Sequence, residues 1–64
     1  MLLLLVDEAV MLHTGDRVQH AVYSNWVGTV MGEVRYQGSW YKVVLWDGDE
    51  EGKDIATIFL KRLP

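Results

Sequence analysis

The chain has 64 residues, of which 50% are hydrophobic and 11% aromatic, and its formal net charge is −3. This composition predicts one small folded domain and excludes a disordered chain, which would be poor in apolar side chains. The acidic balance counts against a protein that coats DNA or RNA, because such proteins need a large basic surplus. The absence of cysteine excludes disulfides and fits a reducing, cytoplasmic location, and two histidines are too few for a structural zinc site.

Residues 1–12 form an apolar segment ahead of the domain predicted over residues 13–64. The run of leucines resembles the start of a signal peptide, but it lacks a basic beginning, and Asp7 and Glu8 interrupt it. It is also too short to span a bilayer, which takes about 20 apolar residues. We expect Met1–Leu12 to be buried, either as an extra strand or turn or against a second copy. Alternatively, Met11 is the natural start and Met1–Val10 is upstream sequence.

After this segment come short runs rich in β-branched and aromatic side chains, and none of them has a helical period. Five strands are predicted: Asp16–Val22, Trp26–Tyr36, Ser39–Asp47, Lys53–Thr57 and Lys61–Leu63. Gln37-Gly38 and Asp47-Gly48 are turn signals on either side of the third strand. Ile58–Leu60 suits one 3₁₀ turn before the last strand.

The interior of the predicted strands carries a second signal. Val18 is the expected core residue of the first strand. In the second strand, alternation places Gly28, Val30 and Val34 on one face. Glycine inside a strand is typical of tight curvature or a bulge, so Gly28 and Gly32 predict a bent strand. Five short strands with one bent member predict a small all-β barrel.

The turn and core residues resemble those of a Tudor/KOW-like SH3 barrel. The matching stretches are Gly15-Asp16-Arg17-Val18, Gly28-Thr29-Val30, Tyr41-Lys42-Val43 with Asp47-Gly48, and Leu60-Lys61-Arg62-Leu63. The resemblance implies a five-stranded SH3-like barrel. In that family, similar modules at the end of bacterial DNA-repair helicases and in transcription factors dock on proteins or nucleic acids and are not catalysts.

The chain is also similar to the plasmid-type (type II) dihydrofolate reductases, short SH3-like chains that assemble four copies around one pore. The similar residues are Gly15-Asp16-Arg17-Val18, Trp26, Gly28, Val30-Met31-Gly32 and Leu60-Lys61-Arg62. Those enzymes line the pore with Val-Gln-Ile-Tyr, where this chain reads Asp54-Ile55-Ala56-Thr57, and His20 or Ala21 replaces an expected lysine. This second resemblance implies a mobile gene cassette protein that keeps the architecture without the reductase residues.

The family pattern also implies a surface patch. It places Tyr41, Val43 and Leu45 inside the barrel, which turns the alternate residues of that strand outward. The predicted interaction patch consists of Trp40, Val44 and Trp46, joined by Trp26 and Tyr23. Exposed apolar area marks binding surfaces, and tryptophan and tyrosine are enriched at interface hot spots. Three occupants stay open: a second copy, a foreign protein, and the Met1–Leu12 segment.

Charged residues offer a second kind of contact. Arg17, Lys61 and Arg62 would meet if the first and last strands pair, and they would then form a nucleic-acid contact beside an aromatic ring. The acidic run from Asp47 to Asp54 lacks the calcium-loop pattern and is interpreted as a solvated turn. The sequence has no triad, phosphate-loop or metal-hydrolase motif, so no catalytic residue, metal or cofactor is predicted.

These observations predict a cytoplasmic, non-enzymatic interaction module. It forms a homo-oligomer, a dimer or a tetramer, or docks on a protein partner through the aromatic patch. One alternative is a Tudor/KOW-like docking module for nucleic-acid or transcription machinery, which the net charge disfavours. The other is a type II dihydrofolate reductase-like enzyme with a pore shared between copies. No membrane partner is predicted.

Overall fold

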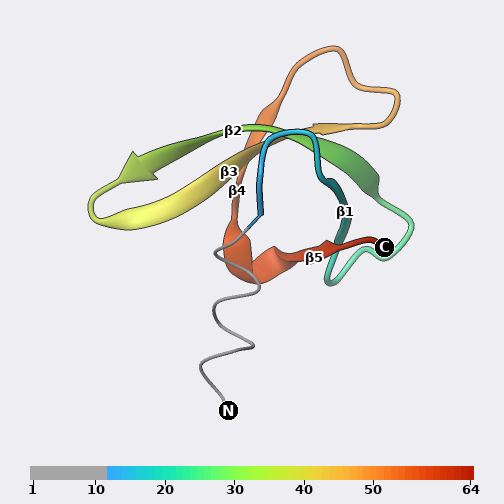
Figure 1. The fold of residues 1–64 in the computed structure, drawn as a ribbon, viewed down its shortest axis with the longest axis horizontal. Helices are drawn as coiled ribbons and strands as arrows, with labels where there is room; N and C mark the ends of the chain where they lie inside the picture. The colour runs from blue at the N-terminus through green and yellow to red at the C-terminus, as the bar shows by residue number, and fades with distance from the viewer. Residues whose placement is uncertain (1–11) are drawn as a thin grey trace.

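The computed structural model describes residues 12–64, which form five antiparallel strands in one sheet (Figure 1). The elements are β1 (Arg17–His20), β2 (Val27–Tyr36), β3 (Ser39–Trp46), β4 (Lys53–Ala56), the 3₁₀ turn η1 (Thr57–Phe59) and β5 (Leu60–Arg62). Their order in the sheet is β4-β3-β2-β1-β5, so the last strand returns to pair with the first. This arrangement confirms the predicted five-stranded SH3-like barrel. The strand or turn expected at the N-terminus falls on residues 1–11, outside the described residues.

Turn residues set the ends of the strands, and every predicted strand matches an observed one to within two residues at each end. Gln37 and Gly38 join β2 to β3 with φ values of 48° and 84°. Two positive values are what a two-residue type I′ hairpin turn requires. Gly48, with φ of 93°, turns the chain after β3. The turns predicted at Gln37-Gly38 and Asp47-Gly48 are therefore confirmed.

A one-residue bulge in β2 decides which side of β3 faces the core. On the side of the β2–β3 turn, the last regular pair is Gly32 with Val43. The following pair is Val30 with Val44, which leaves Met31 without an opposite residue. A shift of one residue moves the side chains beyond it to the other face of the sheet. Past the bulge, Val30 therefore shares a face with Val44 rather than with the next residue of β3. The prediction that Val34 lies on the same face as Gly28 and Val30 is wrong, because Val34 stands on the hairpin side of the bulge and pairs with Tyr41.

The bulge makes the predicted facing of β3 wrong. Val44 is 0% exposed and Trp46 is 8% exposed, so both belong to the core and not to an outward patch. The three residues predicted inside are only half-buried: Tyr41, Val43 and Leu45. The members of the predicted patch that do lie at the surface are Trp40, Trp26 and Tyr23.

The core is one apolar cluster with contributions from β1, β2, β3 and β5. Its members are Leu12, Val18, Val30, Val44, Trp46 and Leu60, with Ile55 packed against them. Val18 is confirmed as a core residue. Lys42, next to Val44 on the same side of β3, is 4% exposed, and its Nζ donates to Glu33 Oε1 at 2.9 Å. The ion pair supplies a partner for a buried charge that would otherwise be costly.

Gly28 sits where β2 passes closest to Trp46. A Cβ at Gly28 would lie 2.6 Å from the carbonyl oxygen of Leu45 and 2.9 Å from Cα of Trp46. Both are backbone atoms, which cannot swing aside as the end of a side chain can. Gly32, the other glycine of β2, has no atom within 4 Å of the place a Cβ would take. A larger side chain is therefore accommodated at Gly32 but not at Gly28.

We expect Gly28→Ala to lower the free energy of unfolding by about 1–3 kcal/mol or more, because it forces a methyl group into packed backbone. Gly32→Ala is the matched control and should stay within about 0.5 kcal/mol of the unmodified chain. Urea unfolding of the two variants measures both values. Equal losses would contradict the close approach at Gly28.

Candidate functional site

Five rings gather around the loop of residues 21–26, which joins β1 to β2 and is called here the 21–26 loop. The rings are those of His20, Tyr23, Trp26, Trp46 and Phe59, and we call them the aromatic cluster. His20 lies at its centre, with ring centroids 4.9 Å from Tyr23, 5.3 Å from Trp26, 5.8 Å from Trp46 and 5.7 Å from Phe59. The cluster links β1, the loop, β3 and η1.

His20 fixes the 21–26 loop through both its ring and its backbone. Its Nδ1 accepts hydrogen bonds from the backbone N–H groups of Val22 and Tyr23 at 3.0 and 3.1 Å. An imidazole nitrogen that accepts has no proton of its own, so the ring proton is on Nε2. The backbone N–H of His20 donates to the carbonyl of Trp26 at 2.9 Å. The loop is therefore held at both ends by one residue.

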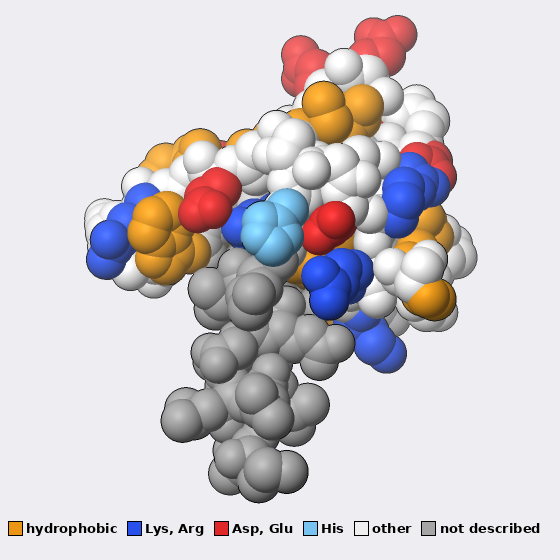
Figure 2. Space-filling view, in the orientation of Figure 1, with side chains coloured by type: hydrophobic (Ala, Val, Ile, Leu, Met, Phe, Trp, Pro, Cys, Tyr) orange, Lys and Arg blue, Asp and Glu red, His pale blue; other side chains and the backbone are white. Residues whose placement is uncertain are grey.

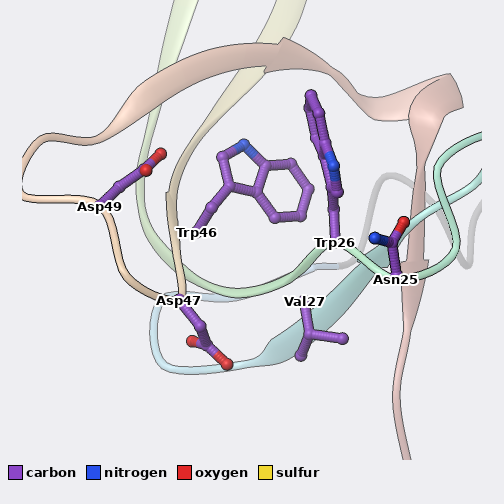
Figure 3. A pocket seen from close by; sticks show the side chains of 6 residues that line it. All are labelled: Asn25, Trp26, Val27, Trp46, Asp47 and Asp49. Atoms are coloured by element: carbon purple, nitrogen blue, oxygen red, sulfur yellow. The ribbon is translucent and has the colours of Figure 1, made fainter.

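Trp26 ends this loop and forms one wall of a cleft of about 420 Å³ (Figure 3). The residues that line the cleft are Asn25, Trp26, Val27, Trp46, Asp47 and Asp49. The indoles of Trp26 and Trp46 have centroids 5.8 Å apart and planes inclined at 62°. In Figure 3 the Asp49 carboxylate lies on the Trp46 side, whereas Asp47 points away from the indoles.

The two carboxylates of the cleft differ in their partners. Arg17 Nη1 and Nη2 donate to Asp47 Oδ1 and Oδ2 at 2.9 and 2.6 Å. These hydrogen bonds hold the pKa of Asp47 below its ordinary value, and the same contact raises the pKa of Arg17. Asp49 forms no ion pair within residues 12–64. The cleft thus keeps one uncompensated carboxylate, and acidic side chains gather at the tip of the loop that follows β3 (Figure 2).

The predicted basic contact is only partly assembled. β1 and β5 pair as expected, with Gln19 opposite Lys61. However, the guanidinium of Arg17 is bound to Asp47, and Arg62 Nη1 lies 3.9 Å from Asp16 Oδ2. Carboxylates therefore compensate two of the three cations. A nucleic-acid contact at Arg17, Lys61 and Arg62 stays a prediction.

The structure brings together three members of the predicted patch, Tyr23, Trp26 and Trp46, while Trp40 stands apart on the β2–β3 hairpin. There the Arg35 guanidinium lies 4.9 Å over the Trp40 ring. The sequence-based prediction missed His20, Phe59 and Asp49. His20 had a usable signal, since it alternates with Val18 along β1 and both are buried.

The described lining of the cleft consists of two indoles, two carboxylates, an amide and a valine side chain. Within residues 12–64, no three His, Asp or Glu side chains come close enough to hold a metal ion. A cation is the ligand class that such a lining attracts.

The ionisation of Asp47 makes the stability of the folded chain depend on pH. Its pKa is lower in the folded chain than in the unfolded chain, so its contribution to stability is full above about pH 4 and is lost as the pH falls through the folded value. Asp47→Asn should therefore destabilise the chain at about pH 6, and the difference should shrink at about pH 2.5. Urea midpoints at both pH values measure it, with Asp49→Asn as the control. A difference that is constant with pH would contradict the assignment.

Comparisons with known proteins assign the chain to no family. No family model, curated protein or solved structure matches it. Within residues 12–64, no helix is long and apolar enough to cross a membrane. The function of the chain must therefore be inferred from the geometry of the cleft and of the surface around it.

Proposed function

We propose that this chain is a non-enzymatic interaction module that binds a cationic side chain of a partner protein in the cleft between Trp26 and Trp46. The observation that carries the proposal is the meeting of two indoles with the carboxylate of Asp49, which has no ion-pair partner in the described part of the chain, around one opening. A lysine or arginine cation over a tryptophan face gains about 0.5–1 kcal/mol at exposed sites and about 2 kcal/mol when desolvated. The carboxylate adds Coulomb attraction to the same ligand.

Apolar side chains around the cleft supply area for the rest of a partner. The exposed large hydrophobic residues of the 21–26 loop and η1 are Val22, Tyr23, Trp26, Ile58 and Phe59. The backbone N–H of Ala21 donates to the carbonyl of Phe59 at 2.7 Å, which ties the two segments together. Adjacent exposed apolar groups support a protein interaction surface. We call this surface the docking face.

The charges beside the docking face favour a basic protein segment over a phosphate backbone. Asp49 is followed by Glu50 and Glu51, and the chain as a whole carries a net charge of −3. Such a field attracts lysine and arginine and repels phosphates. A nucleic-acid module, the alternative predicted from the sequence, has less support. Of the cations it would use, Arg17 and Arg62 already face carboxylates.

The proposal is tested by titrating the chain with a blocked pentapeptide that has arginine at its centre, while NMR follows the three indole N–H signals. We expect the Trp26 and Trp46 signals to shift and the Trp40 signal to stay in place. Trp26→Ala should weaken binding by about 2- to 30-fold, the loss of one cation–π contact. Asp49→Asn should weaken binding and reduce its dependence on salt.

Trp40→Ala is the matched control, because Trp40 is 46% exposed and Trp26 is 45% exposed. The control should bind as the unmodified chain does. A peptide with glutamine in place of arginine should not shift the indole signals. Equal weakening by the two tryptophan variants, or equal binding of the glutamine peptide, would sink the proposal.

A further inference from the structure

The outer half of β2 has a strand edge that no described residue covers. β1 pairs with β2 only from Val27 to Thr29, and Gly15 and Asp16 extend these contacts to Val30. From Gly32 to Tyr36, β3 is the sole neighbour of β2 among residues 12–64. Figure 1 shows this end of the hairpin projecting away from the rest of the barrel. An uncovered edge is a template for pairing with another chain.

The backbone groups of Glu33 and Arg35 point toward this edge. The two-residue turn closes on the pair of Tyr36 and Ser39, which in such a hairpin exchanges both backbone hydrogen bonds. Hydrogen-bonded and non-hydrogen-bonded pairs alternate along antiparallel strands. The next pair, which contains Arg35, is therefore not hydrogen-bonded, the pair of Val34 is, and the pair of Glu33 again is not. The N–H and C=O groups of these two residues are therefore directed away from β3.

We propose that the chain forms a two-fold dimer in which β2 pairs antiparallel with β2 of a second copy, centred on Val34. In this register Glu33 of one copy lies opposite Arg35 of the other, and each is in a position to exchange backbone hydrogen bonds. Opposite charges placed directly across a strand pair stabilise it. The strand is therefore complementary to itself, which a two-fold interface requires. This surface is separate from the cleft of the proposed function.

Charge also selects this register over its neighbours. A two-fold axis through Glu33 would oppose two glutamates, and an axis through Arg35 would oppose two arginines. Like charges directly opposite destabilise a strand pair. Glu33 is bonded to Lys42 at 2.9 Å, and Arg35 lies over Trp40, so contacts within the chain already hold both side chains on the hairpin. The half-exposed Tyr36 lies on the opposite face with Val34 and would be flanked by the second copy.

Charge reversal tests the pairing by analytical ultracentrifugation. Arg35→Glu and Glu33→Arg each place like charges opposite in both bonded pairs, so each variant alone should sediment with the 7.4 kDa mass of one chain. The unmodified chain should sediment with twice that mass at the same concentration. An equimolar mixture of the two variants restores both opposite-charge pairs and should regain the dimer mass. An unmodified chain that is still monomeric at about 1 mM, or single variants that associate as it does, would overturn the proposal.

A cysteine at position 34 tests the register without disturbing the ion pair of Glu33 and Lys42. The chain has no cysteine of its own, and Val34 would face its counterpart in a non-bonded pair, where Cα atoms lie about 4.5 Å apart. That distance permits a disulfide. Val34→Cys should therefore oxidise to a covalent dimer at least about tenfold faster than Ser39→Cys. Ser39 is exposed on the same face of the hairpin, but on β3 and away from the axis. Equal oxidation rates would overturn the register, whether or not the charge variants fold.

Discussion

The imidazole of His20 is buried beneath the 21–26 loop, where its Nδ1 accepts two backbone N–H groups and its ring touches four other rings. Each of these hydrogen bonds contributes about 0.5–1.5 kcal/mol net, so the two together are a sizeable part of the stability available to a domain this small. The loop carries Trp26, and Trp26 is one wall of the cleft. A single side chain in the core thus connects the packing of the barrel to the surface proposed to bind a partner.

The bulge at Met31 also determines the packing of the sheet. The sequence predicts the positions of the strands, but it does not predict which residues this bulge turns toward the core. Strand positions are readable because Gln37-Gly38 and Gly48 need backbone conformations that few residues adopt. The two glycines of β2 also predict a bulge, which is present. The sequence does not show at which residue the bulge lies, and a shift of one residue decides which side chains of β3 face the core. Without the bulge, regular pairing from the hairpin would set Val30 opposite Leu45, the arrangement that the family pattern implied.

The candidate site was predictable only in part, for related reasons. Tyr23 and Trp26 lie at the surface because a short loop cannot bury both, and that could be expected from their place between two strands. The cleft needs Trp46 turned inward past Gly28, which depends on the bulge. The difference between Asp47, which is paired, and Asp49 depends on Arg17, which is 30 residues from Asp47 along the chain. No local pattern records a contact over that separation.

The tautomer of His20 in solution tests most directly whether this side chain organises the site. Long-range ¹H–¹⁵N NMR of the imidazole distinguishes a protonated from an unprotonated Nδ1. We expect the proton on Nε2 and an Nδ1 that accepts from the amides of Val22 and Tyr23. A proton found on Nδ1 would contradict it, because that nitrogen could then accept neither amide and the 21–26 loop would have to be held in another way.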